Sequence, residues 1–466
     1  MPINSFLYPG AKFTPAYEVA NSCRFDDGSS DNLTRTTDTP DNRDKFTISA
    51  WVKLSSHASK NPIVSFYGSN DYCSLLYNDE RIQFIVYDGG NIANISLTSR
   101  HRDFSAWYNI VVAVDSTQST SSDRIKIYVN GVQETTLTDS SYPSQNADII
   151  RSTMTTNAIG RNVDQNGTNF YFDGYLAEIV CIDNQQLTPT SFGEFDEDSP
   201  TIWKPKSVSG LTFGTNGFYL DFENASSLGA DVSGNSNNFT VNNLTSVDQS
   251  TDTCTNNFAT FNPLVIGNSP TLAEGNLKFS SSDANWRASA STIGFTQGKW
   301  YAEFKLDSAN DYVNTGIATM SHFQQTTNVK IGYTSTSYGY DANNGNYYVG
   351  DSATSYGASL SSGDILGVAL DLDNNKLYFS KNGTFQNSGD PTSGSTGTGA
   401  ISITSGLEYF IATSAYGSGK GASANFGSPS FSISSGNADA NGHGNFEYSV
   451  PSGYFSLCTK NLAEFG

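Results

Sequence analysis

The sequence predicts an all-β protein built from two antiparallel β-sandwiches in tandem. Gly (42), Tyr (25) and Phe (29) are abundant while charged residues make up only 15% of the chain, a balance that favours strands and turns over helices. A length of 466 residues exceeds one ordinary sandwich and suits two large modules. One order of strand, turn and strand also occurs in both halves of the chain, which suggests that one architecture is used twice.

The first sandwich is predicted from strand-like segments at 46–54, 82–87, 107–114, 125–129 and 170–180. In the first of them Phe46, Ile48 and Ala50 alternate with other residues and share one face, as in a half-buried strand. The segment 125–129 runs into Asn130–Gly131, the dipeptide that best tolerates the positive φ angles of a two-residue hairpin turn.

The second sandwich is predicted from the same order of elements. An apolar strand that ends in Asp371 is followed by a turn and by the strand 376–381, which ends in Asn382–Gly383. In the first half, the strand that ends in Asp115 leads in the same way to Asn130–Gly131. Both modules are therefore expected to share one architecture.

Composition divides the chain into five parts. These are an N-terminal docking segment (1–20), the first sandwich (21–200), a connector (201–275), the second sandwich (276–435) and a C-terminal tail (436–466). The connector is rich in Asn, Ser and Thr, but Phe218, Leu220 and Phe222 alternate within it. This alternation predicts packing on the edge of a sheet rather than disorder.

The charge and the apolar pattern exclude several classes of partner. A net charge of -20 without a basic stripe argues against nucleic acid, because phosphate binding depends on clustered Lys and Arg. No apolar run approaches the ~20 residues of a membrane helix, and the start lacks the pattern of a signal peptide. The five cysteines are scattered singly, so we expect buried free thiols and assembly in a reducing cytosol.

Two sets of segments carry a family resemblance. The first set lies at 25–33, 48–52, 107–111, 128–131 and 172–179. By these segments the first sandwich resembles the laminin-G-like group of the concanavalin A-like lectin/glucanase superfamily. The second set lies at 363–371, 377–383 and 425–427. By these segments the second sandwich resembles a SPRY domain.

The resemblance implies a fold and a way of binding. Both families consist of bent antiparallel sheets of jelly-roll type packed face to face, and both bind ligands through rim loops or the concave face. Recognition is far commoner than catalysis in them, although fold alone does not fix function. The tandem order, the turn 231–235 and the closing segments 451–454 and 461–462 are similar to structural and tail proteins of phages.

The sequence offers no catalytic motif of the related glycan-cleaving enzymes. These place two carboxylates on one strand in a Glu-x-Asp-x-Glu spacing. The acidic string Glu194–Asp198 has a different spacing, and we interpret it as a solvated turn. The four histidines are far apart and no Gly-x-Ser-x-Gly elbow accompanies them. We therefore expect a protein that is not an enzyme.

Five tyrosines on a Gly-, Asn- and Ser-rich stretch are the candidate ligand-binding residues. They are Tyr338, Tyr340, Tyr347, Tyr348 and Tyr356. Tyrosine offers a rigid apolar surface with a polar tip, which suits stacking on sugar rings or anchoring a protein partner. The alternative interpretation is packing in the core or between subunits. Trp51 and Trp300, on predicted core strands, are interpreted as packing residues.

A calcium site is the only cofactor that the sequence suggests. Asp231, Ser233, Asn235 and Asn237 alternate as the oxygen ligands of a calcium loop do, and 164–167 is a second oxygen-rich turn. Neither segment matches the twelve-position EF-hand loop. Side chains that cap their own turns are the alternative explanation of both.

The functional hypothesis is a virion structural protein, a phage fibre or appendage subunit that attaches to a host-surface glycan or protein. Its N-terminal segment would dock to other virion proteins or to sister subunits, with homo-oligomers expected and a trimer for a fibre. It would be assembled in the host cytoplasm and exposed on the particle, without insertion into a membrane. The alternatives are a purely architectural filament or capsid decoration protein, and a glycan depolymerase, which a cleft with two carboxyl groups ~5 to 10 Å apart would favour.

Overall fold

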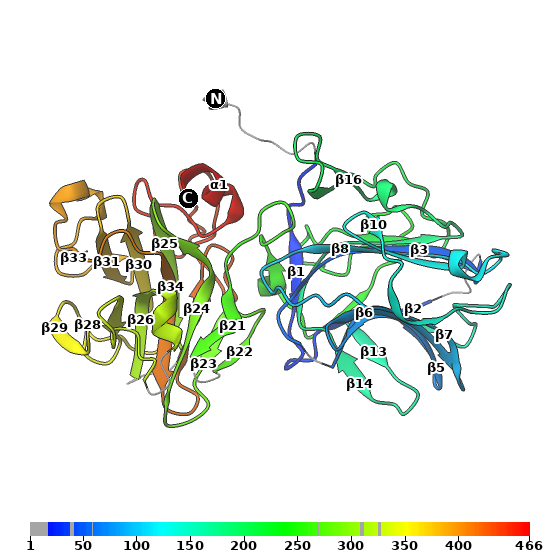
Figure 1. The fold of residues 1–466 in the computed structure, drawn as a ribbon, viewed down its shortest axis with the longest axis horizontal. Coiled ribbons are helices and arrows are strands. Elements are labelled where there is room, and N and C mark those ends of the chain that lie inside the picture. The colour runs from blue at the N-terminus through cyan, green and yellow to red at the C-terminus, as the bar shows by residue number, and fades with distance from the viewer. Residues whose placement is uncertain (1–16, 38–41, 58, 268–269, 308–311, 325–327) are drawn as a thin grey trace.

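The computed structural model describes residues 17–37, 42–57, 59–267, 270–307, 312–324 and 328–466, which form two β-sandwiches side by side (Figure 1). The predicted tandem all-β fold is confirmed. In the described part of the chain the only α-helix is α1 (Thr459–Phe465). None of the described helices is long and apolar enough to cross a membrane. Most of the predicted docking segment, residues 1–16, lies outside the described residues.

The first sandwich packs two antiparallel sheets of eight strands each. The strands of one sheet are β1 (Ser22–Phe25), β3 (Lys45–Leu54), β8 (Tyr108–Asp115), β9 (Ile125–Val129), β10 (Val132–Gln133), β15 (Gly174–Asp183), β18 (Phe218–Leu220) and β20 (Gln249–Ser250). Their order is β10-β9-β8-β3-β15-β1-β20, and β18 also pairs with β15. The predicted segments at 46–54, 107–114 and 125–129 all fall in this sheet.

The strands of the other sheet are β2 (Asn32–Thr36), β4 (Lys60–Tyr67), β5 (Asp71–Asn78), β6 (Arg81–Asp88), β7 (Asn91–Leu97), β11 (Leu137–Ser141), β12 (Thr156–Ile159) and β19 (Thr240–Asn242). Their order is β11-β7-β6-β5-β4-β12-β2-β19. Two separate hairpins flank the sandwich, β13 (Arg161–Val163) with β14 (Asn169–Tyr171) and β16 (Gly193–Phe195) with β17 (Trp203–Pro205). The short 3-10 turns η1 (Ser121–Asp123) and η2 (Pro189–Ser191) lie in its loops.

The second sandwich also has two antiparallel sheets. One is ordered β21-β24-β34-β26-β27-β28-β29. Its strands are β21 (Phe261–Gly267), β24 (Trp286–Phe295), β26 (Tyr312–Ala318), β27 (Ser337–Asp341), β28 (Asn346–Val349), β29 (Ser352–Ser355) and β34 (Tyr409–Tyr416).

The other sheet is ordered β22-β23-β35-β25-β30-β31-β32, with β33 paired to β31. Its strands are β22 (Thr271–Ala273), β23 (Lys278–Ser280), β25 (Lys299–Leu306), β30 (Ile365–Asp371), β31 (Lys376–Lys381), β32 (Thr384–Phe385), β33 (Ile401–Ser402) and β35 (Gly421–Asn425). The 3-10 turns η3 (Ser246–Asp248), η4 (Met320–Gln324) and η5 (Pro391–Thr396) complete the described elements.

The alternating apolar residues of strand β3 form part of the core of the first sandwich. Phe46, Ile48 and Ala50 point into the space between the sheets, as the alternation predicts. The expectation of a half-buried strand is wrong, because the opposite face of β3 is buried as well. The segment 187–213 covers this side of the sheet, where Phe192 and Phe213 form an outer apolar cluster. Trp51 and Trp300 are both buried, which confirms them as packing residues.

The two Asn–Gly dipeptides form matching hairpins. Asn130 (φ 47°) and Gly131 (φ 80°) connect β9 to β10, and Asn382 (φ 47°) and Gly383 (φ 78°) connect β31 to β32. In each hairpin the asparagine Oδ1 accepts the backbone N–H of the neighbouring strand, from Asn109 (2.8 Å) or from Ile365 (2.9 Å). The same Asn–Gly turn therefore connects equivalent strands in both sandwiches, as the repeated sequence order predicts.

The connector does not hang between the sandwiches: its part up to Ser250 completes the first sandwich, and its last strands, β21 and β22, belong to the second. Its strands β18, β19 and β20 pair with β15, β2 and β1, which covers backbone edges that would otherwise stay open. Phe218, Leu220 and Phe222 are buried in the first core, so the predicted packing of this alternating segment is confirmed.

The C-terminal tail packs on the second sandwich. Phe446 and Tyr454 are buried in a cluster with Tyr301. The buried Glu303 carboxylate of β25 accepts the backbone N–H groups of Glu447 (2.9 Å) and Tyr448 (2.8 Å). This carboxylate therefore fastens the tail to the sheet.

A buried ion pair fastens the connector to the first sandwich at the point where the chain crosses to the second. Lys53 Nζ lies 2.6 Å from Asp252 Oδ2, and both side chains are 1% exposed. The same ammonium donates to Asn257 Oδ1 (2.7 Å) and to the carbonyl of Phe258 (3.1 Å). The other oxygen of Asp252 accepts Trp107 Nε1–H (3.1 Å), so both charges are well supplied with partners.

Further bonds cross directly between the sandwiches. Asn276 Nδ2 donates to the carbonyl of Ser55 (2.8 Å), and the Tyr175 hydroxyl donates to the carbonyl of Gly275 (2.9 Å). On the side of the first sandwich, Arg24 of β1 pairs with Asp248 of η3 at 2.8 Å. We call this region, where 248–276 meets the first sandwich, the junction.

We predict that Asp252→Ala lowers the free energy of unfolding by about 3 to 5 kcal/mol, because it leaves the Lys53 ammonium buried without a counter-charge. Urea unfolding of the full chain measures this loss. The double variant Lys53→Met/Asp252→Leu, which removes both charges, should recover most of it. A cost below about 1 kcal/mol for Asp252→Ala, the value of a surface pair, would contradict the prediction.

Candidate functional site

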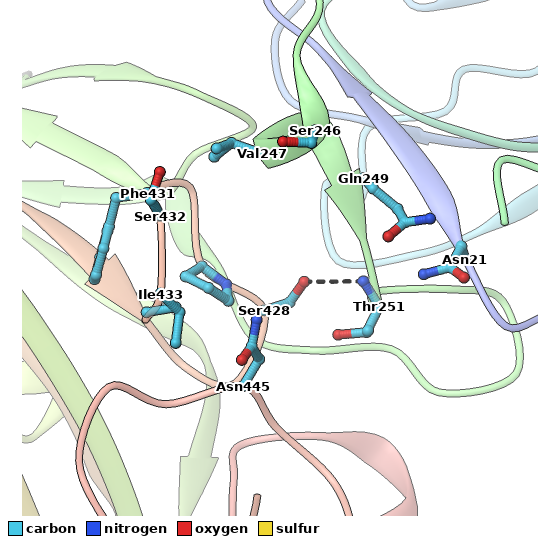
Figure 2. A pocket seen from close by; sticks show the side chains of 11 residues that line it. Asn21, Ser246, Val247, Gln249, Thr251, Ser428, Phe431, Ser432, Ile433 and Asn445 are labelled. Carbon is cyan, nitrogen blue, oxygen red and sulfur yellow. Dashed lines mark hydrogen bonds between the residues drawn. The ribbon is translucent and has the colours of Figure 1, made fainter. Parts of the chain in front are cut away.

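A groove lies between the two sandwiches, beside the junction (Figure 2). Its volume is about 250 Å³, close to the roughly 300 Å³ at which small-ligand sites begin. It is lined by Asn21, Ser246, Val247, Gln249, Thr251, Ser428, Pro429, Phe431, Ser432, Ile433 and Asn445. Residues from the start, the middle and the end of the chain thus meet in one place.

One wall of the groove belongs to the connector. It is formed by η3 and the short strand β20, which Thr251 follows. A capping box fixes η3, since the Thr245 side chain accepts the N–H of Val247 and the Asp248 carboxylate accepts the N–H of Thr245 at 2.7 Å. Gln249 is held by two bonds from its amide to the carbonyls of Phe222 and Glu223, 2.8 Å each.

The opposite wall follows β35 and consists of the segment 428–433 with Asn445. The Ser428 hydroxyl joins the two walls: it lies 2.8 Å from Ser250 Oγ and accepts the N–H of Thr251 at 3.2 Å (Figure 2). Ser250 and Ser428 are both buried, and Ser428 also lines the groove.

The chemistry of the groove is neutral. None of its lining residues carries a titratable side chain; hydroxyl and amide groups alternate with the apolar surfaces of Val247, Pro429, Phe431 and Ile433. Such a lining matches a ligand that has many hydroxyl groups and one apolar face. The lining residues include no general acid or base.

The five predicted tyrosines do not form one exposed surface. Tyr338, Tyr340 and Tyr356 are 5%, 0% and 6% exposed, and their hydroxyls bond internally to Thr404 (3.2 Å), to the carbonyl of Ala358 and to the carbonyl of Gly399 (3.0 Å). The ligand-binding prediction is therefore wrong for these three, because the core of the second sandwich encloses them.

Tyr347 and Tyr348 are half-buried and keep part of their surface open. The Lys330 ammonium lies 3.4 Å from the centre of the Tyr348 ring, a cation–π contact. These two remain predicted ligand residues. The period-two spacing of Tyr338 and Tyr340 places the pair on one face of β27, but it does not say whether that face is covered.

The predicted calcium turn forms a closed network of hydrogen bonds. Asp231 Oδ1 accepts the N–H groups of Tyr219 and Ser233 (2.9 Å each), and Oδ2 accepts the Ser233 hydroxyl (2.9 Å) and the N–H of Asn237 (2.8 Å). The amides of Asn235 and Asn237 donate to the carbonyl of Gly217 at 2.9 and 2.8 Å. The structure therefore favours the alternative, a self-capped turn, because a calcium ion would have to displace these bonds.

Three other carboxylates meet at the junction side of the first sandwich. Asp26 and Asp27 follow β1, and Asp173 precedes β15. These two strands pair with each other, and Phe25 of β1 lies opposite Gly174 of β15. Oxygen atoms of the three side chains all lie within 4.8 Å of one another. Burial and, to a smaller extent, the charge of Asp27 raise the pKa of Asp173 to about 7, while the Ser56 hydroxyl opposes the shift.

Sequence reasoning missed this cluster because about 145 residues of unrelated strands separate its two parts. A signal was present in the repeated Phe–Asp pattern of the segments 25–28 and 172–174. Only the pairing of β1 with β15 turns that repetition into a site.

Glu178 is a second functional group that the sequence did not single out. It has a positive φ of 50° at a β-bulge in β15, between the registers of Ala177 and Val180 with β3. Its carboxylate accepts the hydroxyls of Tyr219 (2.7 Å) and Tyr17 (2.9 Å). Burial raises the pKa of Glu178 to about 7, although both hydroxyl donors lower it.

Comparison with protein families agrees with this architecture. Residues 27–191 match the model described as the concanavalin A-like lectin/glucanases superfamily, of the laminin G type. Residues 299–428 match the model of the SPRY domain. The chain therefore carries a concanavalin A-like domain followed by a SPRY domain, as the sequence resemblance implies.

The solved structures that match the chain include two human SPRY domains. The SPRY domain of human HERC1 is 17% identical over 35% of this chain and 96% of its own, with a TM-score of 0.29. A second human SPRY domain is 14% identical over 32% of this chain and 90% of its own, with a TM-score of 0.24. A comparison with curated proteins gives no match.

We predict that the protein loses stability as the pH rises from about 4.5 to about 7. Over this range the folded chain retains the Glu178 proton that the unfolded chain has released, so unfolding becomes easier with rising pH. The loss due to this group is about 3 kcal/mol. It should be complete slightly above pH 7.

Urea unfolding between pH 5 and pH 8 measures this loss, with Glu178→Gln as the comparison. The variant keeps the shape of the side chain but cannot ionise, so its stability should fall less over the same range. Asp173 and other carboxyls with a raised pKa contribute equally to both proteins. Equal slopes for both proteins would show that Glu178 does not titrate as its burial requires.

Proposed function

We propose that this protein is a non-catalytic recognition subunit of a virus particle, which binds the sugar units of a host-surface glycan in the groove between its two sandwiches. The observation that carries the proposal is the neutral, hydroxyl- and amide-rich lining of that groove. Sugars present hydroxyl groups that both donate and accept hydrogen bonds. They also present C–H faces that pack on aromatic rings such as that of Phe431.

The chemistry of the groove supports binding rather than cleavage. Hydrolysis of a glycosidic bond uses a pair of carboxyl groups on either side of that bond. The lining residues provide none. Asp26, Asp27 and Asp173 lie close together, but none of them lines the groove, and Asp26 and Asp173 are only 9% and 8% exposed, so a sugar in the groove would not meet two of these carboxyls.

The junction supports the proposal by holding the two walls in fixed positions. Lys53 and Asp252 anchor the connector wall to the first sandwich, and the Ser250–Ser428 bridge joins it to the wall of the second. A site that is formed before binding loses less conformational entropy when the ligand arrives. The groove is small, so we expect modest affinity for a single site.

A modest single-site affinity suits a protein that is displayed in several copies. A symmetric homo-oligomer, a trimer in the case of a fibre, would turn weak contacts into strong attachment. The net charge of -20 would keep such surface subunits apart and soluble. Within this proposal residues 1–20 dock to the particle or to sister subunits, and the protein is exposed on the particle surface. The likeness of the tandem order to phage structural proteins supports this placement.

We predict that Thr251→Trp reduces glycan binding at least about tenfold, because the indole fills the groove. Phe431→Ala should also reduce glycan binding, because it removes the aromatic surface on which a sugar ring would pack. A glycan array and a host-cell retention assay with the purified full-length protein measure both. Thr354→Trp is the matched control, since it adds the same side chain to an exposed strand of the second sandwich away from the groove lining.

The same assay follows any shortening of the bound glycans. Retention without shortening, lost in Thr251→Trp and kept in Thr354→Trp, would support the proposal. Loss of binding in Tyr348→Ala alone would move the site to the half-buried tyrosines. Shortened glycans would contradict the non-catalytic role. The absence of any binding would favour the architectural alternative.

A further inference from the structure

We propose that an apolar patch on the outer side of the first sandwich binds a segment of the same chain, residues 3–13, and that this segment has to leave the patch before it docks elsewhere. The patch consists of Val132, Phe195 and Ile202 around Trp203. The segment belongs to residues 1–16, which lie outside the described part of the chain. None of the patch residues lines the groove, so only the last step, docking elsewhere, rests on the proposed function.

The patch is formed by three exposed apolar side chains that gather around one tryptophan. Val132, Phe195 and Ile202 are 57%, 41% and 56% exposed. The Phe195 ring contacts the Trp203 ring edge-on, with 4.9 Å between the ring centres, and Ile202 directly precedes Trp203 in the chain. Val132 follows Gly131, which lies so close to the Trp203 ring that a Cβ there would come within 2.3 Å of it.

The tryptophan under the patch is held in a fixed position. Trp203 is 8% exposed, and its Nε1–H donates to Asn109 Oδ1 at 3.0 Å. It belongs to a buried cluster with Trp51 of β3 and Ala177 of β15, on the outer side of the sheet. A patch that is formed in advance loses little conformational entropy when a partner binds.

The chain enters the described part of the structure beside this patch. Tyr17 packs on the cluster that contains Trp203, and its hydroxyl donates to Glu178 at 2.9 Å (Figure 1). The segment 3–13 is therefore joined to the patch through only three residues, 14–16. An extended chain spans about 3.3 to 3.6 Å per residue, so the segment reaches the patch by turning back from Tyr17.

The composition of the segment suits an apolar surface. Its large apolar residues are Ile3, Phe6, Leu7, Tyr8 and Phe13. Aromatic rings pack edge-to-face on other aromatic rings, as Phe195 already does on Trp203. The segment therefore offers side chains of the kind that would cover the open parts of this patch.

The charges of the segment and of the patch are complementary. Lys12 is the single charged residue among residues 1–16. The loop between Phe195 and Ile202 carries the exposed Glu197 and Asp198, and it is the acidic string that the sequence shows at 194–198. Lys204 already serves the other two acidic groups of that string, at 3.7 Å from Glu194 and 3.4 Å from Asp196. Glu197 and Asp198 are thus placed to attract the Lys12 ammonium.

The size of the patch favours this segment over a second copy of the protein. Even an aromatic side chain buries only about 150 to 250 Å², so three side chains that are about half exposed offer at most about 400 Å². A stable interface between two proteins takes about 800 Å² from each partner. A tethered segment needs less contact area, because its effective concentration beside the patch is in the millimolar range.

The bound segment would keep the isolated subunit from associating too early. The segment and the patch would cover each other's apolar side chains, which in water favour burial by about 25 cal/mol per Å². Release of the segment would expose both surfaces at once. The segment would then be free to dock to the particle or to a sister subunit.

The first test places a photoreactive group on the patch of the full-length protein. Phe195→p-benzoylphenylalanine keeps an aromatic ring at this exposed position, and mass spectrometry locates the cross-links formed on illumination. We expect cross-links to residues 3–13. The matched control is Tyr312→p-benzoylphenylalanine on an exposed position of the second sandwich, which should give none to that segment. A mixture of isotope-labelled and unlabelled chains shows whether both ends of a cross-link come from one chain.

The second test measures how fast trypsin cleaves after Lys12 in the full-length protein. Phe195→Ser and Ile202→Ser should each raise this rate by about three- to tenfold, because cleavage follows the population of the released segment. Leu264→Ser, which removes an apolar side chain 61% exposed on the second sandwich, should leave it unchanged. Circular dichroism checks that each variant is folded.

Three results would overturn the proposal. These are the absence of cross-links from position 195 to residues 3–13, cross-links that join only labelled to unlabelled chains, and unchanged cleavage after Lys12 in both folded patch variants. The second of them would assign the patch to the segment of a sister subunit. Neither test involves a glycan, so failure of the proposed glycan site would leave both results intact.

Discussion

The buried pair of Lys53 and Asp252 is the interaction on which the arrangement of the two sandwiches depends. Its partners come from β3 and from the segment that enters the second sandwich, and both charges lie in an interior where water cannot solvate them. Such a pair tolerates little displacement, because separating the charges costs several kcal/mol. The connector therefore has one position relative to the first sheet. The connector residues that line the groove or lie near the carboxylate cluster are therefore held in fixed positions.

The connector has a second consequence for the fold. Its short strands extend both sheets of the first sandwich, so a segment rich in Asn, Ser and Thr ends as part of a folded domain. The edges of sheets attract unwanted pairing, and covering them with the protein's own chain prevents it. The same segment then presents Thr251 and η3 to the second sandwich. One stretch of chain thus closes one domain and positions the next.

Buried carboxylates in this protein are satisfied in different ways, and the differences decide their roles. Asp252 has a lysine partner, and Glu303 has backbone N–H donors that hold the C-terminal tail. Glu178 has two tyrosine hydroxyls, which leave its pKa raised and make it sensitive to pH. Asp173 has an oxygen, Oδ1, with no hydrogen-bond partner in the described part of the chain.

The sequence by itself determined the features that depend on neighbouring residues. Alternation located β3, β8 and β9, and Asn130–Gly131 and Asn382–Gly383 located the two hairpins, because strand pleat and turn geometry are local. Alternation does not say which face of a strand is covered, so it could not separate buried Tyr340 from half-buried Tyr348. Only the tertiary structure decided the functional sites. The groove and the carboxylate cluster join residues more than 100 positions apart, and their contacts exist only after the sheets have paired and the connector has packed.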